Sequence, residues 1–253
     1  MERYNEDEII TISYCNYLYY LGGNINQLSV SQLLFKDLIL KLNHLILNKQ
    51  LKNIDLFLNK YLKTLIKKYY SEINTIDDLS YLHSFYSQLF FKYISLFPIE
   101  KYVPGFIDYK PILKMDDIEL KLNLDLILIQ QNKDAYYHLI CFAKDLDEFN
   151  IKNNPLNYFK LKLLRKIHTK QKRRREPVKI HFLYVPTPTF RNRNQRDYRL
   201  KYLTIDLEDY KEVNTSNFKS LFKNYNKVKP KPRFYCNEKN CTKRKECLNA
   251  NLR

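Results

Sequence analysis

The chain has 253 residues, of which 45% are hydrophobic, so it is long and apolar enough to fold around a sizeable core and is not a disordered protein. No apolar run is long enough to span a membrane and the first residues are acidic, so we expect a cytoplasmic protein with no membrane partner. The formal net charge is +17, and residues 160–201 contain 15 Lys and Arg against 2 Asp and Glu, a net +13. Such a local excess is typical of proteins that bind the phosphate backbone of nucleic acids.

The first part of the chain, residues 1–101, has helical periodicity. It predicts a helix within residues 7–21, which carries Cys15, and a long amphipathic helix over 29–50, which carries His44. Two further helices are expected within residues 53–97, with a turn near 74–78. Prolines at 98, 104 and 111 end this helical part.

From residue 102 the apolar pattern changes to alternation, which predicts a sheet core over residues 102–206. The expected strands are 112–115, 118–129, 136–143, 178–185 and 199–205, with a helix over 155–170 between the third and fourth. The order of elements predicts an α/β fold with a helical N-terminal half and a mixed central sheet. A Lys-Pro connector then opens a Cys-rich tail, residues 229–253.

Two strands of this expected sheet deliver an acid and a lysine. Asp125 is a single carboxylate within the apolar strand LNLDLILI, and Lys144 follows the next strand, CFAK. Phosphodiester hydrolysis needs a divalent cation held by carboxylates and a lysine that assists the attacking water. This pair could therefore form part of a metal-dependent nuclease site, although for an Asp and a Lys taken alone a salt bridge at an edge strand is the more common explanation.

The cysteine pattern predicts a metal site at the end of the chain. Cys236, Cys241 and Cys247 lie within twelve residues, and nearby basic residues favour their thiolate forms. Cys15 could supply a fourth ligand and join the two ends of the chain. Four thiolates suit either an iron–sulfur cluster or zinc.

In chain order, these motifs resemble the RecB-like branch of the PD-(D/E)XK nucleases that carry an iron–sulfur cluster, such as the AddB nuclease domain and the CRISPR-adaptation exonucleases. The resemblance covers SYCNYLYYL with Cys15, LKLNHLIL with His44, the strands of Asp125 and Lys144, YFKLKLL, and the C-terminal cysteines. It implies a restriction-endonuclease-like domain over residues 1–228 and a 4Fe–4S cluster on the four cysteines, packed back on Cys15. It also implies that His44 and Asp125 hold Mg²⁺ or Mn²⁺ while Lys144 assists the water.

Several positions depart from the family pattern. The acid expected two residues before Lys144 is Phe142, the glutamine expected on the following helix is Lys160, and Leu40 replaces a glycine before His44. The first gap in the cysteine triplet is also longer than in the family. The two-carboxylate metal site is therefore incomplete in this sequence.

The basic segment is where we expect DNA, as single strands or ends, to bind. The expected phosphate contacts are Lys160, Arg165, Lys172, Arg173, Arg174, Arg175, Arg191, Arg193 and Arg196. Three functions remain open: a metal-dependent DNA exonuclease, an inactive DNA-binding or scaffold subunit of a recombination, replication or defence complex, and a zinc-stabilised RNA-binding protein. A protein partner such as a helicase or a CRISPR subunit would supply any ATP-driven movement.

Overall fold

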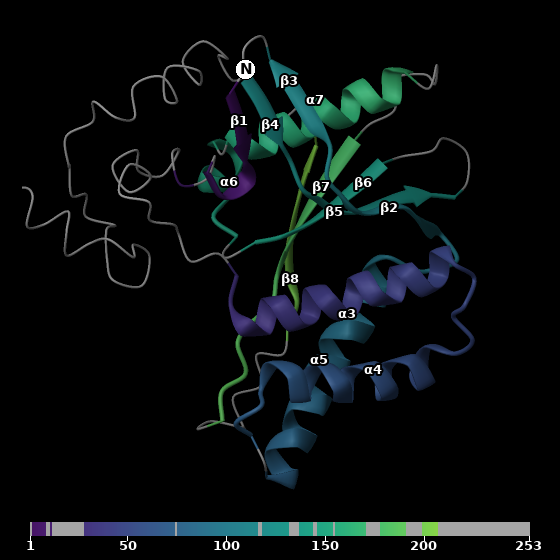
Figure 1. Cartoon of the computed structure of the whole chain (residues 1–253). Helices are drawn as coiled ribbons and strands as arrows, with labels where there is room; N and C mark the ends of the chain where they lie inside the picture. The colour runs from purple at the N-terminus through teal and green to yellow at the C-terminus, as the bar shows by residue number, and fades with distance from the viewer. Residues whose placement is uncertain are drawn as a thin grey trace, which may run out of the picture.

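The computed structural model describes residues 2–8, 11, 28–73, 75–115, 118–131, 137–143, 146–153, 155–170, 178–190 and 199–206. Within these residues the fold is α/β, as the sequence predicts, with the long helices preceding the main sheet in the chain (Figure 1). No helix in the described part of the chain combines the length and the apolar character that crossing a membrane would need.

Three long helices form the first half of the structure, and all three are predicted by the sequence. They are α3 (Val30–Leu47), α4 (Ile54–Tyr69) and α5 (Ile76–Leu96). Each begins directly after a residue whose side chain accepts a hydrogen bond from the first turn: Ser29, Asn53 and Thr75. Ser29 and Gln32 form a reciprocal capping box, which fixes the point where α3 starts.

The main sheet has five strands in the order β2-β5-β6-β7-β8. Their bounds are β2 (Tyr102–Tyr109), β5 (Leu124–Gln130), β6 (Tyr137–Phe142), β7 (Val178–Tyr184) and β8 (Lys201–Asp206). β6 and β7 are parallel and all other neighbours are antiparallel, so the prediction of a mixed sheet is confirmed. The crossover between β6 and β7 contains α6 (Glu148–Asn153) and α7 (Pro155–Lys170).

A second, three-stranded sheet corrects one prediction. It consists of β1 (Glu2–Asn5), β4 (Ile118–Lys121) and β3 (Ile112–Met115), in the order β1-β4-β3. The single strand expected over 118–129 is wrong, because its two halves, β4 and β5, belong to different sheets. The backbone leaves the strand ladder between them: the N–H of Leu122 bonds to Pro111, and the N–H of Asn123 bonds to the carboxylate of Glu6.

The main sheet is covered on both faces, which makes a three-layer arrangement (Figure 1). On one face, Leu126, Ile140 and Leu183 pack in a core shared with α3, α4 and α5. On the other face, Ile127 and Leu139 pack with residues of α7. Successive side chains of each strand therefore pack into two separate cores, one on each face of the sheet. Polar groups at the end of the sheet lie between the two helical layers.

Candidate functional site

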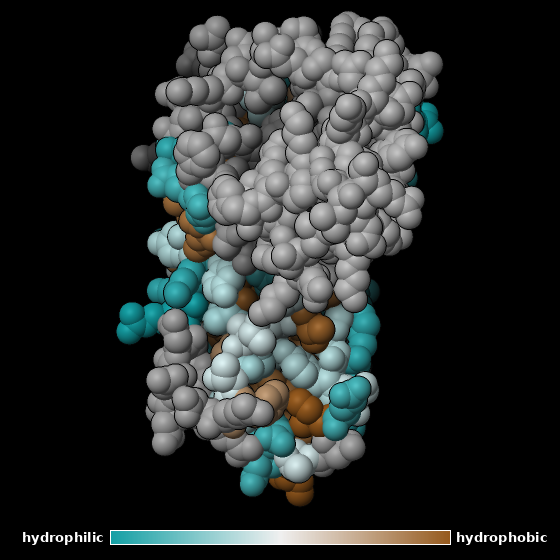
Figure 2. Space-filling view, turned by 90° about the vertical axis from the view of Figure 1, so that its left-hand side faces the viewer, coloured by the Kyte–Doolittle hydropathy of each residue, from teal (hydrophilic) through white to brown (hydrophobic). Residues whose placement is uncertain are grey.

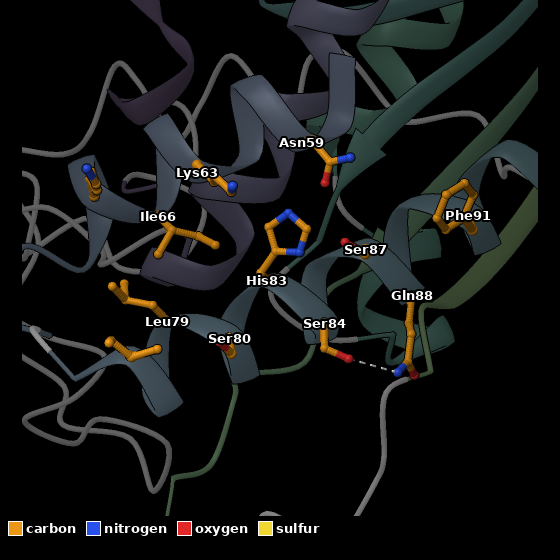
Figure 3. A pocket seen from close by; sticks show the side chains of 12 residues that line it. Asn59, Lys63, Ile66, Leu79, Ser80, His83, Ser84, Ser87, Gln88 and Phe91 are labelled. Atoms are coloured by element: carbon orange, nitrogen blue, oxygen red, sulfur yellow. Dashed lines mark hydrogen bonds between the residues drawn. The ribbon is translucent and has the colours of Figure 1, made fainter. Parts of the chain in front are cut away.

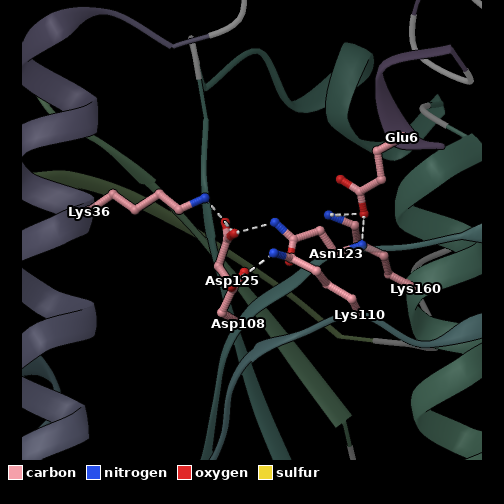
Figure 4. Close-up of polar contacts among 7 residues, drawn as sticks. All are labelled: Glu6, Lys36, Asp108, Lys110, Asn123, Asp125 and Lys160. Carbon is pink, nitrogen blue, oxygen red and sulfur yellow. Dashed lines mark hydrogen bonds and ion pairs between the residues drawn. The ribbon is translucent and has the colours of Figure 1, made fainter.

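The candidate site lies at one end of the main sheet, where β5 begins and β6 ends. Asp125 is the second residue of β5, and the β5–β6 register, which pairs Leu126 with Ile140, continues toward Asp125 and Cys141. Figure 4 shows side chains from α3 and α7 reaching this point from opposite sides. The site therefore draws its groups from both helical layers.

Asp125 is held by a lysine of α3. The ammonium group of Lys36 donates to Asp125 Oδ1 at 2.5 Å, and the amide of Asn123 donates to the same oxygen at 3.2 Å. The side chains of Lys36 and Asp125 are only 20% and 12% exposed, so little water surrounds this ion pair. A carboxylate in such surroundings is stable as an anion only if a cation or several donors compensate its charge.

A second ion pair lies beside the first. Lys160 of α7 is 7% exposed, and its ammonium nitrogen is 3.1 Å from an oxygen of Glu6. The same carboxylate accepts a hydrogen bond from the backbone N–H of Asn123. Burial disfavours the charged form of Lys160, but the charges of Glu6 and its neighbours outweigh it, so the pKa of Lys160 is raised. Lys160 is therefore a cation in the folded protein.

Cys141 shares this end of the sheet but is not a nucleophile. Its side chain is buried, and burial raises the pKa of its thiol to about 12. At neutral pH the group is a neutral thiol, which neither attacks an electrophile nor binds a metal readily.

Asp108, near the end of β2, adds a third carboxylate at this end of the sheet. In the β2–β5 register its neighbours pair with Leu126 and Leu124, which places Asp108 opposite Asp125 (Figure 4). Its φ angle is 47°, a left-handed conformation that is uncommon for a residue other than glycine. Lys110 compensates its charge at 3.0 Å, so each of the three carboxylates has its own lysine.

The first turn of α3 fixes the geometry between the helix and the strand ends. Gln32, which is buried, donates to the carbonyl of Ala143 at 2.7 Å, directly after β6. Ser31 donates to the carbonyl of Pro186 at 2.7 Å, just beyond β7. These two bonds join α3 to the carboxyl ends of both parallel strands and so set where Lys36, one turn later, reaches Asp125.

The structure brings together only part of the expected site. Asp125 and Lys160 lie in it, whereas the ring of His44 is exposed, eight residues beyond Lys36 and therefore about 12 Å further along α3. Lys36 takes the place on α3 that His44 was expected to take, and Phe142 packs toward the core of the α3–α5 layer.

Other expected residues cannot be placed against this geometry. Arg165 lies on α7, and nothing further is described of its side chain. The remaining expected residues lie outside the described ranges: Lys144, the cysteines Cys15, Cys236, Cys241 and Cys247, and the basic residues Lys172, Arg173, Arg174, Arg175, Arg191, Arg193 and Arg196.

The described donor set does not fit a hard divalent cation. Mg²⁺ and Mn²⁺ require several oxygen ligands that are free to coordinate. The carboxylates of Asp125, Glu6 and Asp108 are each engaged by an ammonium group instead. In the described part of the chain, no three His, Cys, Asp or Glu side chains are grouped so that they could hold a metal ion. A divalent cation could bind here only if the lysine side chains moved away from these carboxylates.

Five further residues of the site were not predicted from the sequence: Lys36, Lys110, Glu6, Asn123 and Asp108. A lysine on the polar side of an amphipathic helix and a glutamate in an acidic N-terminus are ordinary surface residues by pattern. A signal was present for Asn123, since a polar residue two positions before Asp125 lies on the same side of a strand. The contact between Lys36 and Asp125 joins residues 89 positions apart, and no local pattern reports it.

No protein-family model matches the chain, and a search of curated proteins finds no match.

Proposed function

We propose that the chain is a nucleic-acid-binding protein of RecB-like nuclease type whose site carboxylates are held by lysines rather than by a divalent metal. The observation that carries this proposal is the ion pair between Lys36 and Asp125, with its 2.5 Å contact. In this role the protein is a non-hydrolytic DNA-binding subunit of a recombination, replication or defence complex, and it acts on single strands or ends.

The order and adjacency of elements support the restriction-endonuclease-like part of the proposal. α3 precedes β5, which carries Asp125; β5 pairs antiparallel with β6, which leads to Lys144; and α7 follows with Lys160. This is the order of helix, acid-bearing strand, lysine-bearing strand and helix that the family resemblance implies. Lys160, at the position of the family's glutamine, contacts Glu6 in the site.

The charges of the site support binding without hydrolysis. Asp125 and Glu6 contribute two negative charges, and Lys36 and Lys160 contribute two positive ones at contact distance. These carboxylates therefore already have their counter-ions, and the apolar Phe142 adds no further oxygen ligand at the end of β6. The lysines hold this end of the sheet together and no metal-dependent step is assigned to it.

The distribution of basic residues supports nucleic acid as the partner. The segment with net charge +13 spans residues 160–201 and includes the arginine-rich stretches at 172–175 and 191–196. Its first residue, Lys160, is buried and paired with Glu6, so the other basic residues are the ones proposed to contact phosphates. Phosphate contacts from Lys and Arg supply most sequence-independent affinity for nucleic acids.

One assay separates a binding protein from an enzyme. A labelled single-stranded oligonucleotide is incubated with the anaerobically purified protein and Mn²⁺, beside an Asp125→Ala variant. The proposal predicts that the protein shifts the oligonucleotide on a native gel and leaves its length unchanged on a denaturing gel. Cleavage that is absent in the Asp125→Ala variant would overturn the non-hydrolytic role.

The exonuclease remains a second candidate because Asp125 stands at the start of β5, beside the strand that leads to Lys144. For the four cysteines we propose a 4Fe–4S cluster, with zinc as the alternative. A brown protein with broad visible absorption that disappears on replacing Cys241 by Ser supports the cluster. A colourless protein that contains zinc and prefers RNA would favour the zinc-stabilised RNA-binding protein instead.

A further inference from the structure

A groove runs between α4 and α5 on the side of the helical layer away from the sheet (Figure 3). It has a volume of about 760 Å³, and α4 lines it from Asn59 to Lys67 while α5 lines it from Ile76 to Phe91. On α5 the lining positions recur every three or four residues over four turns, so they form one continuous stripe. The stripe is about 22 Å long, which matches a helical segment of about 15 residues.

Four of the twelve residues that line the groove are apolar, and polar side chains such as Ser80, Ser84 and Gln88 lie between them on α5. Ile76 is 81% exposed and Phe91 is 48% exposed, at the two ends of the stripe, with Leu79 between them. In the space-filling view, hydrophobic surface emerges among hydrophilic residues at the lower end of the molecule, where the helical layer lies (Figure 2). Large apolar side chains that line an open groove are typical of a binding surface.

The charged groups of the groove are all basic. Lys63 and Lys67 lie one turn apart on α4, and no Asp or Glu is among the described residues that line the groove. A partner that carries acidic residues along one side of an apolar stripe complements this surface.

Two polar atoms inside the groove have no hydrogen-bond partner among the described residues: Nε2 of His83 and Oγ of Ser87. Both side chains face the groove in Figure 3. Burial and the nearby charge of Lys63 lower the pKa of His83, so its ring is neutral at pH 7.

We propose that the groove between α4 and α5 binds an amphipathic helix of a partner protein, with an apolar face in the groove and acidic residues beside Lys63 and Lys67. This goes beyond nucleic-acid binding, because the groove lies on the opposite side of α3 from the sheet that carries Asp125 (Figure 1). The chain can therefore hold a protein at the helical layer and a nucleic acid at the end of the sheet at the same time, as a subunit of a larger complex must.

The test uses synthetic peptides and the full-length protein. The probe is an amphipathic peptide of about 15 residues with leucines at i, i+3, i+4 and i+7 and glutamates elsewhere, measured by fluorescence anisotropy. A scrambled peptide of the same composition and a lysine-for-glutamate version serve as ligand controls. We expect the acidic amphipathic peptide to bind at least tenfold more tightly than either control.

Variants then locate the binding surface. Ile76→Asp and Lys67→Glu should each weaken binding about tenfold. Leu56→Asp and Lys92→Glu, which alter exposed residues of the same two helices outside the groove, should change it less than twofold. The proposal is overturned if the scrambled peptide binds equally well, if no peptide binds, or if both pairs of variants have the same effect. It is also overturned if a single-stranded oligonucleotide displaces the peptide, because the groove would then be a nucleic-acid site.

Discussion

Two lysine–aspartate ion pairs, each with one residue on α3, differ in how far their side chains are exposed to water. Lys36 and Asp125 are 20% and 12% exposed, whereas Lys68 and Asp37 are 60% and 37% exposed with a similar contact of 2.9 Å. A charge that is mostly removed from water depends on its partner, while an exposed ion pair is largely screened. We therefore expect the pair of Lys36 and Asp125 to stabilise the folded site. The exposed pair of Lys68 and Asp37 should contribute little and serves as the control.

We expect Lys36→Met to lower the free energy of unfolding by about 2 kcal/mol, because among the described residues Asp125 then keeps only its hydrogen bond from Asn123. The same substitution should raise the affinity for Mn²⁺, since a carboxylate without its lysine is free to coordinate. Urea denaturation and Mn²⁺ electron paramagnetic resonance measure the two effects. Lys68→Met should change neither, and equal behaviour of the two variants would contradict the role given to Lys36.

Some residues of the site could be identified from the sequence, and others could not. Asp125 is conspicuous because a single acid interrupts an apolar strand, and Lys160 because it opens the basic segment. Lys36 and Glu6 are not conspicuous, since their role depends on contacts between distant segments. Phe142 signals the missing acid in the sequence, but only the structure shows that lysines occupy the surroundings of the remaining carboxylates.

At the scale of elements, a buried histidine pair joins the parallel strands β6 and β7. Nδ1 of His138 lies 2.8 Å from Nε2 of His181, and Nδ1 of His181 lies 2.9 Å from the hydroxyl of Thr204 on β8. Both rings are buried between Phe97 and Tyr102. Burial lowers the pKa of His138 to about 4 and that of His181 to about 3.

The protein should therefore lose stability as pH falls below 6.5, the ordinary histidine value. There the unfolded chain binds protons that the folded protein does not, so each histidine lowers the free energy of unfolding by about 1.4 kcal/mol per pH unit until its folded pKa is approached. Urea denaturation between pH 7 and pH 5 measures this slope. The ring resonances of His138 and His181 should not titrate above pH 5 in the folded protein, and titration of the pair near pH 6.5 would contradict this explanation.

The junction between α3 and β6 depends on Gln32, which both completes the capping box and donates to Ala143. We expect Gln32→Ala to lower the free energy of unfolding by about 2 kcal/mol, because the partly buried carbonyl of Ala143 loses its donor and the helix loses part of its cap. Gln50→Ala, at an exposed position after the same helix, should have little effect. Thermal and urea denaturation compare them, and similar values for the two variants would mean that Gln32 does not join the two elements.

Most elements of the fold could be predicted from sequence because their signals are local. The periodicity and end signals of α3 and α7 and the short apolar run of β6 appear within a few residues. The join between β4 and β5 could not be predicted in this way. It depends on the Glu6 side chain bonding to the backbone of Asn123 across more than a hundred residues, which breaks an otherwise continuous strand pattern.

For the whole molecule, we propose that a nucleic acid binds at the end of the sheet and that a protein binds at the helical layer. Replacing Arg173, Arg174 and Arg175 with alanine should weaken binding of a single-stranded oligonucleotide and reduce the slope of log K against log salt by up to about 2, at about 0.7 for each phosphate that the variant no longer neutralises. Binding of the acidic peptide at the α4–α5 groove should not change in this variant. Unchanged oligonucleotide affinity and slope would exclude these arginines from the interface.

The central claim is that lysines, not a divalent metal, hold the carboxylates of a nucleic-acid-binding site. It is tested most directly by measuring the affinity of the protein for a labelled single-stranded oligonucleotide in chelator and again in excess Mn²⁺. The account predicts the same salt-dependent affinity in both buffers and an intact oligonucleotide at the end of each titration. Binding that appears only with Mn²⁺, or shortening of the oligonucleotide that requires Asp125, would contradict it.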